Sequence, residues 1–157
     1  MTNGNGNGNG AGTAEAESTW TMQQVYIKDL SFESPNSPAV FAEAISTNVT
    51  MNMQTRSEKL GDDVWEVALK INVHATAGEK SIFMVELDQA ALFRISGFDE
   101  EEQTRILGLR CPEVLYPYAR EVVSSVVSKG GFPPLVLQPI SFGALFAHSQ
   151  SNQKAAS

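Results

Sequence analysis

The sequence predicts a single α+β domain in which β-strands come first and helices follow. In several segments between Trp20 and Phe93, apolar and polar residues alternate with a period of two, which is typical of strands that bury one face. After Asp99, apolar residues recur instead at spacings of three and four, the pattern of amphipathic helices. A chain of 157 residues is long enough for one hydrophobic core and too short for two.

Both ends of the chain are predicted to lie outside this domain, which we place at residues 19–148. Residues 1–18 are an Asn-Gly tract followed by small and acidic residues, so they can bury little apolar surface to offset the entropy of ordering. We therefore expect a disordered N-terminal tail. Residues 149–157 are mostly polar, and we expect them to form a flexible C-terminal tail.

The strands follow from the alternation, segment by segment. Residues 20–28 are rich in aromatic and branched side chains, and residues 49–53 place apolar side chains at every second position. The clearest run is residues 65–74, followed by a turn at residues 76–79 and a second alternating run at residues 83–93. The last two runs predict a long antiparallel hairpin.

The second strand of this hairpin carries apolar residues on both faces. Its second face holds Ile82, Met84, Ala90 and Leu92 beside two carboxylates. A strand that is apolar on both faces requires cover on both. Either a second subunit or a helix on each face would supply it.

Helix signals dominate the second half of the chain. Carboxylates at residues 99–102 suit a first helical turn, and Pro112 suits the first residue of a second helix. The apolar stripe of this second helix is followed by Lys129 in its last turn, and Gly130 is expected to end the helix. The members of the stripe are Leu115, Tyr118, Ala119, Val122, Val123 and Val126.

The segment from Phe132 to Ile140 contains three prolines, so it is expected to be extended. It is also strongly apolar and must lie against another element. Ser141 is then expected to cap a short helix that contains Phe142 and Phe146. Two interpretations remain open here: an apolar groove between the crossover and the helices, or a crossover that is simply buried.

Composition excludes several classes of function. The formal net charge of -7 argues against binding to the phosphate backbone of nucleic acids. The single cysteine fits a reducing compartment. No apolar run is long enough to span a membrane and no signal peptide is recognisable, so we expect a cytoplasmic protein without membrane insertion.

No catalytic, metal or cofactor motif is recognisable. Cys111 would need His74 or His148 as a base, but the sequence has no nucleophile elbow. One cysteine and two distant histidines give no metal-ligand spacing. Residues 99–102 lack the pattern of a calcium loop, and the Asn-Gly repeats lack the lysine of a phosphate-binding loop. We therefore expect neither enzymatic activity nor a cofactor.

Several motifs, in order along residues 20–147, closely resemble those of the SecB protein-export chaperones. The matching segments are YIKDLSFESPN at residues 26–36, DDVWEV at residues 62–67, CPEVLYPYARE at residues 111–121, GFPP at residues 131–134 and PISFGALF at residues 139–146. Four of these five segments are six residues or longer, and matches of this length in the same order are far more specific than one short pattern.

The resemblance implies a four-stranded antiparallel sheet with helices on one face, assembled as a homotetramer that is a dimer of dimers. It implies a chaperone that binds unfolded precursor proteins in the cytosol, keeps them competent for translocation and delivers them to the translocation ATPase SecA, without using a nucleotide.

The resemblance also assigns residues to three surfaces. An acidic sheet face that would bind the basic tail of SecA matches Asp29, Glu33, Met84 and Glu86. The tetramer contact matches Val85, Leu87 and Gln89. The client groove matches Phe41, Phe132, Leu135, Leu137, Phe142 and Phe146.

Three other functions compete with export. The first is a SecB-like chaperone dedicated to another client, such as an antitoxin. The second is a small module whose groove binds a lipid or metabolite, and the third is an enzyme that uses Cys111. The acidic residues at the SecA-facing positions argue against the first of these.

Overall fold

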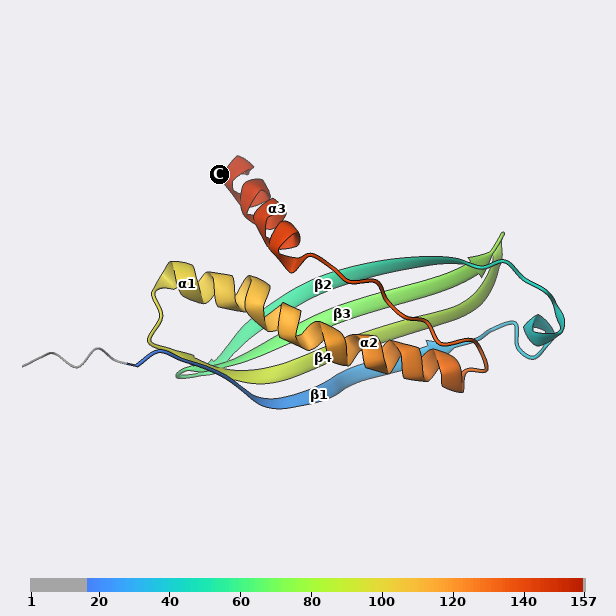
Figure 1. Cartoon of the computed structure of the whole chain (residues 1–157), viewed down its shortest axis with the longest axis horizontal. Coiled ribbons are helices and arrows are strands. Elements are labelled where there is room, and N and C mark those ends of the chain that lie inside the picture. The colour runs from blue at the N-terminus through green and yellow to red at the C-terminus, as the bar shows by residue number, and fades with distance from the viewer. Residues whose placement is uncertain (1–16, 157) are drawn as a thin grey trace, which may run out of the picture.

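The computed structural model describes residues 17–156, so the predicted N-terminal tail falls almost entirely outside the described residues. The fold is a four-stranded antiparallel sheet in the order β1-β4-β3-β2, with the helices on one face (Figure 1). The sequence prediction of the fold class is thereby confirmed. The strands are β1 (Thr19–Glu33), β2 (Asn48–Gly61), β3 (Val64–Ala77) and β4 (Lys80–Ser96).

The predicted hairpin is formed by β3 and β4, whose register pairs Val67 with Ala91 and Ile71 with Leu87. Its turn contains Gly78 at φ +60°, a backbone conformation that glycine adopts without steric cost. Because β1 pairs with β4 rather than with β2, the chain between β1 and β2 has to pass from one edge of the sheet to the other. This connection includes a 3-10 turn at Ala39–Ala42.

A nearly continuous helical rod crosses the covered face of the sheet. It consists of α1 (Glu100–Arg105), a π-helical segment (Ile106–Arg110) and α2 (Cys111–Lys129). Asp99 caps the first turn, since its side chain accepts a hydrogen bond of 2.8 Å from the Glu102 amide. The sequence predicts two separate helices here, whereas the structure joins them through a wider π-helical turn that ends at Arg110, two residues before Pro112, which lacks a backbone N–H.

The core lies between α2 and the sheet. Alternate residues of β3 and β4 meet the buried stripe of α2, which consists of Leu115, Ala119, Val123 and Val127. The core side chains Leu69, Ile71 and Val85 are each 0% exposed. Burying a side chain of this size stabilises the fold by about 1.5–3 kcal/mol.

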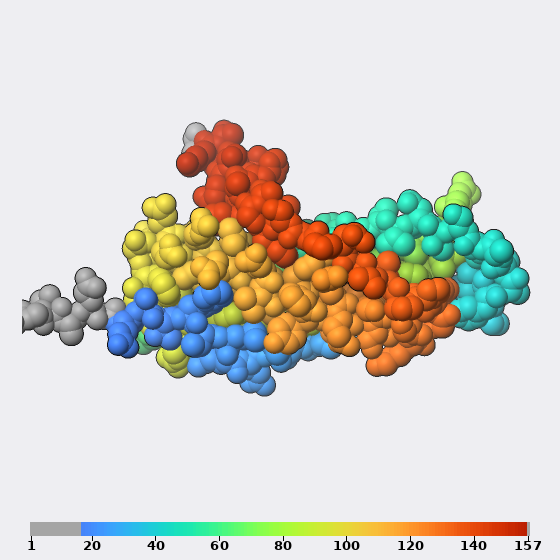
Figure 2. All heavy atoms as spheres, viewed as in Figure 1, coloured from blue at the N-terminus to red at the C-terminus, as the bar shows by residue number. Residues whose placement is uncertain are grey.

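The extended crossover of residues 132–141 runs back along α2 and leads into α3 (Phe142–Ala155), which rises from the body (Figures 1 and 2). The Tyr116 hydroxyl on α2 donates a hydrogen bond to the Gln138 carbonyl and so fixes the crossover. As predicted, Ser141 caps α3 by accepting a hydrogen bond from the Ala144 amide. Residues 149–155 continue this helix, beyond the boundary that we expected, and their flexibility stays a prediction.

Two of the three residues of the predicted tetramer contact lie inside the subunit. Val85 and Leu87 face α2 and are 0% and 1% exposed, and the tetramer contact itself stays a prediction. Gln89 is also buried, but it borders a surface pocket described below. The need for a second cover had been inferred from the other face of β4, and no helix among residues 17–156 covers that face (Figure 1).

Candidate interaction surfaces

The helix-free face of the sheet brings the predicted acidic residues together. In the register, Glu33 on β1 lies opposite Met84 on β4, while Glu86 lies opposite Ser31 one step further along. Asp29 follows on the same face, opposite Asp88. The side chains of Asp29, Glu33 and Glu86 are exposed, so three carboxylates line one end of an open surface. We call Asp29, Glu33, Met84 and Glu86 the acidic surface.

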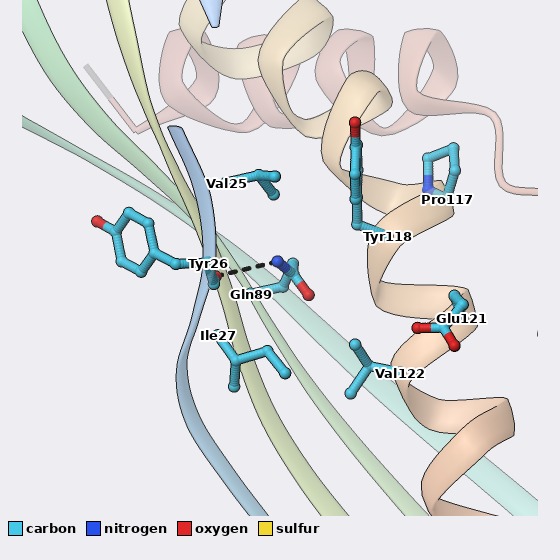
Figure 3. Close-up of a pocket in the computed structure, with 8 residues that line it drawn as sticks. All are labelled: Val25, Tyr26, Ile27, Gln89, Pro117, Tyr118, Glu121 and Val122. Carbon is cyan, nitrogen blue, oxygen red and sulfur yellow. Dashed lines mark hydrogen bonds between the residues drawn. The ribbon is translucent and has the colours of Figure 1, made fainter. Parts of the chain in front are cut away.

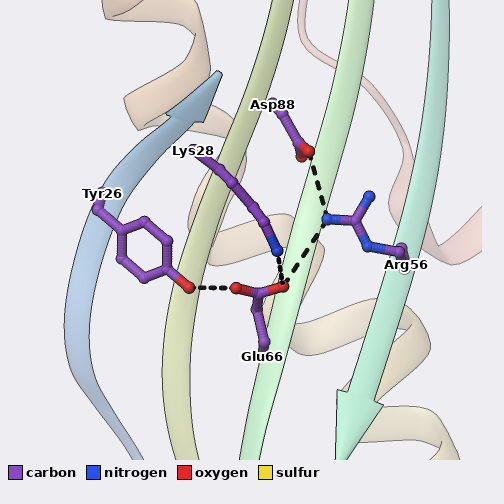
Figure 4. A network of polar contacts seen from close by, with 5 residues as sticks. All are labelled: Tyr26, Lys28, Arg56, Glu66 and Asp88. Carbon is purple, nitrogen blue, oxygen red and sulfur yellow. Dashed lines mark hydrogen bonds and ion pairs between the residues drawn. The ribbon is translucent and has the colours of Figure 1, made fainter.

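A polar network lies beside the acidic surface and draws on all four strands (Figure 4). Its centre is the Glu66 carboxylate of β3, whose side chain is only 8% exposed. The Tyr26 hydroxyl donates to this carboxylate, and the Lys28 ammonium lies 2.7 Å from its Oε1 atom. Arg56 of β2 lies 3.7 Å from Glu66 and 3.3 Å from Asp88 of β4.

The network shifts two pKa values in opposite directions. The hydrogen bond from Lys28, followed by the one from Tyr26, lowers the pKa of Glu66, so the carboxylate is ionised at neutral pH. Burial, followed by the hydrogen bond to Glu66, raises the pKa of Tyr26 to about 12. The network was not predicted, because the sequence shows Glu66 on a polar strand face but does not show which residues of three other strands reach it.

Aromatic side chains line a cavity at the end of the molecule where α2 stops. The cavity has a volume of about 410 Å³ and brings together Phe41, Phe132 and Leu135 of the predicted client groove. The ring of Phe132 lies 5.3 Å from that of Phe41 and 5.1 Å from that of Phe83, centroid to centroid. Phe41 remains 51% exposed, so part of this aromatic wall faces solvent.

Two glycines at the end of α2 make the close packing of these rings possible. A Cβ atom on Gly130 would lie 2.1 Å from the ring of Phe32, which stacks on Phe83. Gly131 adopts φ +90° and lies against Phe41, so a side chain there would be strained and would crowd the ring. We call the cavity with its rings, Phe41, Phe83 and Phe132, the aromatic cavity.

The remaining groove residues lie elsewhere. Phe142 and Phe146 line a second cavity of about 490 Å³ between α3, the π-helical segment and strands β2 and β3. Leu137 lines neither cavity and, like Phe142, is buried in the core. The residues of the predicted groove therefore lie around two cavities at opposite ends of the crossover and in the core, and their role in client binding stays a prediction.

A third pocket, of about 390 Å³, lies between the edge strand β1 and α2 (Figure 3). Val25 and Ile27 line it from β1, and Tyr118 and Val122 line it from α2. Gln89 forms part of the pocket wall and donates a hydrogen bond of 3.0 Å from Nε2 to the Tyr26 carbonyl. Sequence analysis had placed Tyr118 and Val122 on the buried stripe of the helix, but Tyr118 is 41% exposed.

The possible catalytic residues are not arranged for catalysis. Cys111 is fully buried, and burial raises the pKa of its thiol to about 12, so it is protonated at neutral pH. His74 contacts the Ser81 hydroxyl, and His148 contacts the Asn152 amide. Within residues 17–156, no three acidic, histidine or cysteine residues cluster as metal ligands. No helix in this part of the chain is long and apolar enough to cross a membrane.

Comparison with known proteins gives concordant results. The family model described as preprotein translocase subunit SecB matches residues 13–153. The protein-export protein SecB of Hahella chejuensis (strain KCTC 2396) is 42% identical over 136 residues, which cover 87% of this chain and 86% of the relative.

A solved structure shares the fold at low sequence identity. It is a SecB-like chaperone of Mycobacterium tuberculosis in complex with a peptide from the HigA1 antitoxin. The TM-score is 0.65 and the sequence identity 18%, over 78% of this chain and 91% of that one.

Proposed function

The chain belongs to the SecB family of protein-export chaperones, and from this premise we propose that it holds unfolded precursor proteins in the cytosol and delivers them to the SecA ATPase. The observation that carries the proposal is the separation of two surfaces. An exposed aromatic cavity lies on the helix-covered side, and the acidic surface lies on the opposite face of the sheet. One molecule can therefore hold a client and dock on a basic partner at the same time.

Clients are captured by burial of their apolar segments. The aromatic cavity offers the rings of Phe41 and Phe132 together with the aliphatic Leu135. Burial of apolar surface is not directional, so such a cavity selects exposed hydrophobic segments without reading a sequence. A folded protein hides these segments and escapes capture.

SecA docks on the acidic surface. Its basic tail meets Asp29, Glu33 and Glu86, while Met84 supplies an apolar contact among them. Charges at an exposed surface act mainly on the association rate and are screened by salt. Docking is therefore expected to be fast and sensitive to ionic strength.

For the proposed homotetramer, exposed apolar side chains are available at the edge of β1. The outer edge of β1 has no strand partner among the described residues. Ile27, Leu30 and Tyr118 lie along this edge and the adjoining pocket and are 47%, 37% and 41% exposed. A second copy of the chain would pair the free edge and cover these side chains. Several copies engaging one long client would add avidity.

Export is favoured over a dedicated antitoxin client by the acidic surface. A chaperone with one dedicated client has no need of a docking site for the translocation ATPase. The antitoxin peptide in the mycobacterial structure concerns a chain that is 18% identical, a level at which the likeness shows the fold alone.

Two variants test the proposal in two assays. Phe132→Ala is expected to weaken capture of a urea-unfolded precursor and leave SecA binding unchanged, whereas Glu86→Lys is expected to do the reverse. Both binding constants are measured by light scattering or calorimetry with purified components. If Glu86→Lys binds SecA as tightly as the parent chain, the docking face is wrongly assigned. If Phe132→Ala captures clients normally, the cavity is not the client site.

A further inference from the structure

The polar network contains two cations that lie close to the acidic surface, Lys28 and Arg56. Lys28 and Arg56 lie on the helix-free face with side chains that are 44% and 45% exposed. Lys70 also points to this face, opposite Asp88 in the register. If Lys28 and Arg56 were mobile, they would neutralise neighbouring carboxylates in addition to Lys70, so what holds these two cations decides how acidic the surface is.

The backbone places Lys28 next to the acidic surface. The register between β1 and β4 shifts between Ile27 and Asp29, which marks a β-bulge at Lys28. In a regular strand, Lys28 and Asp29 would point to opposite faces. The bulge puts both on the helix-free face, since Lys28 reaches Glu66 while Asp29 lies opposite Asp88.

Two alanines give Glu66 room to reach these cations. One row of cross-strand neighbours runs Tyr26, Ala90, Ala68 and Arg56. Ala90 and Ala68 are 0% and 1% exposed, so the longer side chains close over them. Glu66, in the adjacent row, extends over this low strip and meets Lys28 from one side and Arg56 from the other (Figure 4).

We propose that Glu66 is a positioning residue for SecA docking: it holds Lys28 and Arg56 on its own carboxylate and so keeps them from neutralising Asp29 and the rest of the acidic surface. The inference rests on the proposed docking function and specifies how its charge is maintained. Glu66 itself is almost buried and does not touch the partner. The same hydrogen bonds that lower the pKa of Glu66 keep it charged over the whole physiological range.

The distances support this division of roles. Lys28 lies 2.7 Å from Glu66, within a charge-assisted hydrogen bond. Arg56 is shared between Glu66 and Asp88, at 3.7 Å and 3.3 Å. Both cations of the network are therefore paired with its two carboxylates, Glu66 and Asp88. The acidic residues Asp29, Glu33 and Glu86 lie outside the network.

The test is a set of substitutions that separates positioning from stability. Glu66→Gln removes the central charge and keeps the size of the side chain. The freed Lys28 then pairs with Asp29, and SecA affinity at low salt is expected to fall on the order of threefold to fivefold, the effect of an exposed ion pair. Glu58→Gln is the matched control: Glu58 is exposed, lies opposite Glu66 on β2, and its loss changes the net charge equally.

The decisive variant removes the freed cation as well. Glu66→Gln combined with Lys28→Gln is expected to recover most of the lost affinity, although it deletes a second member of the network. A purely structural role for Glu66 predicts the opposite, because the double variant is then disrupted further. At about 1 M salt, where the Debye length is about 3 Å, all of these variants are expected to bind equally.

Three results would overturn the inference: normal docking by Glu66→Gln, no recovery in the double variant, or an equal loss with Glu58→Gln. Glu86→Lys is measured in the same series. If it abolishes docking while Glu66→Gln has no effect, the acidic surface stands and only the positioning role fails. If Glu86→Lys has no effect, the docking function itself fails.

Discussion

The aromatic cavity depends on the absence of a side chain at Gly130, and adding one methyl group tests this directly. A Cβ atom at this position would lie 2.1 Å from the Cζ atom of Phe32, far inside van der Waals contact. Gly130 has φ -73° and ψ -3°, a conformation that alanine adopts freely. Gly130→Ala therefore causes no backbone strain, and its whole effect comes from the collision with the ring.

The collision is transmitted through stacked rings. The ring centroid of Phe32 lies 6.0 Å from that of Phe83, and the centroid of Phe83 lies 5.1 Å from that of Phe132. A shift of the Phe32 ring therefore disturbs the wall of the cavity. Overpacking of this kind costs about 1–3 kcal/mol. Since each kcal/mol shifts the Tm of a chain of this size by about 2–4 °C, a loss of several degrees is expected.

The assay is urea unfolding together with binding of an unfolded precursor. Gly143→Ala is the control, because a Cβ atom at Gly143 has nothing within 4 Å and the residue lies within α3. Replacing a helical glycine by alanine is expected to stabilise by up to about 1 kcal/mol. If Gly130→Ala proved as stable as the parent chain and captured clients normally, the ring packing described here would be wrong.

Three further predictions concern other parts of the molecule. Gly108→Ala places a Cβ atom 2.8 Å from the Phe146 ring, so α3 is expected to loosen from the π-helical segment, which hydrogen exchange of α3 amides would register; unchanged protection would show that the ring does not hold α3. The buried Cys111 thiol, with its pKa raised to about 12, is expected to react with a thiol reagent at pH 8 only as fast as the chain unfolds, and rapid reaction of the native protein would contradict its burial. Because the pKa of Tyr26 is raised to about 12 from an ordinary value of 10.0, the folded state holds this proton more tightly than the unfolded state. Its contribution to stability is thus complete below pH 10 and is lost as the pH rises towards 12, so Tyr26→Phe should flatten the fall in urea stability over that range, and an unchanged fall would refute the assignment.

Local sequence patterns were sufficient to predict the fold class and most element types. The alternation at residues 65–74 and 83–93 identified the β3–β4 hairpin, and Ser141 marked the start of α3 correctly. These features depend on residues close together in the chain, where periodicity and capping chemistry act.

The sequence does not predict features that depend on residues far apart in the chain. Leu135 and Leu137 look alike in an apolar segment, but only the packing of the crossover on α2 buries Leu137 in the core and leaves Leu135 half-buried beside the aromatic cavity. Val85 and Leu87, which the resemblance places at a subunit contact, lie on the face of β4 that α2 covers, and only the packing of that helix reveals this. The Glu66 network draws on four strands, so only the register of the whole sheet reveals it.

The central claim is that this chain is an oligomeric chaperone that captures unfolded precursors. It is tested most directly by the light-scattering mass of the full chain, alone and after a urea-unfolded precursor is diluted into it. We predict a mass about four times the 17.0 kDa of one chain, rising by the mass of one precursor when the unfolded client is added. A particle whose mass does not change on addition of the unfolded client would contradict the account.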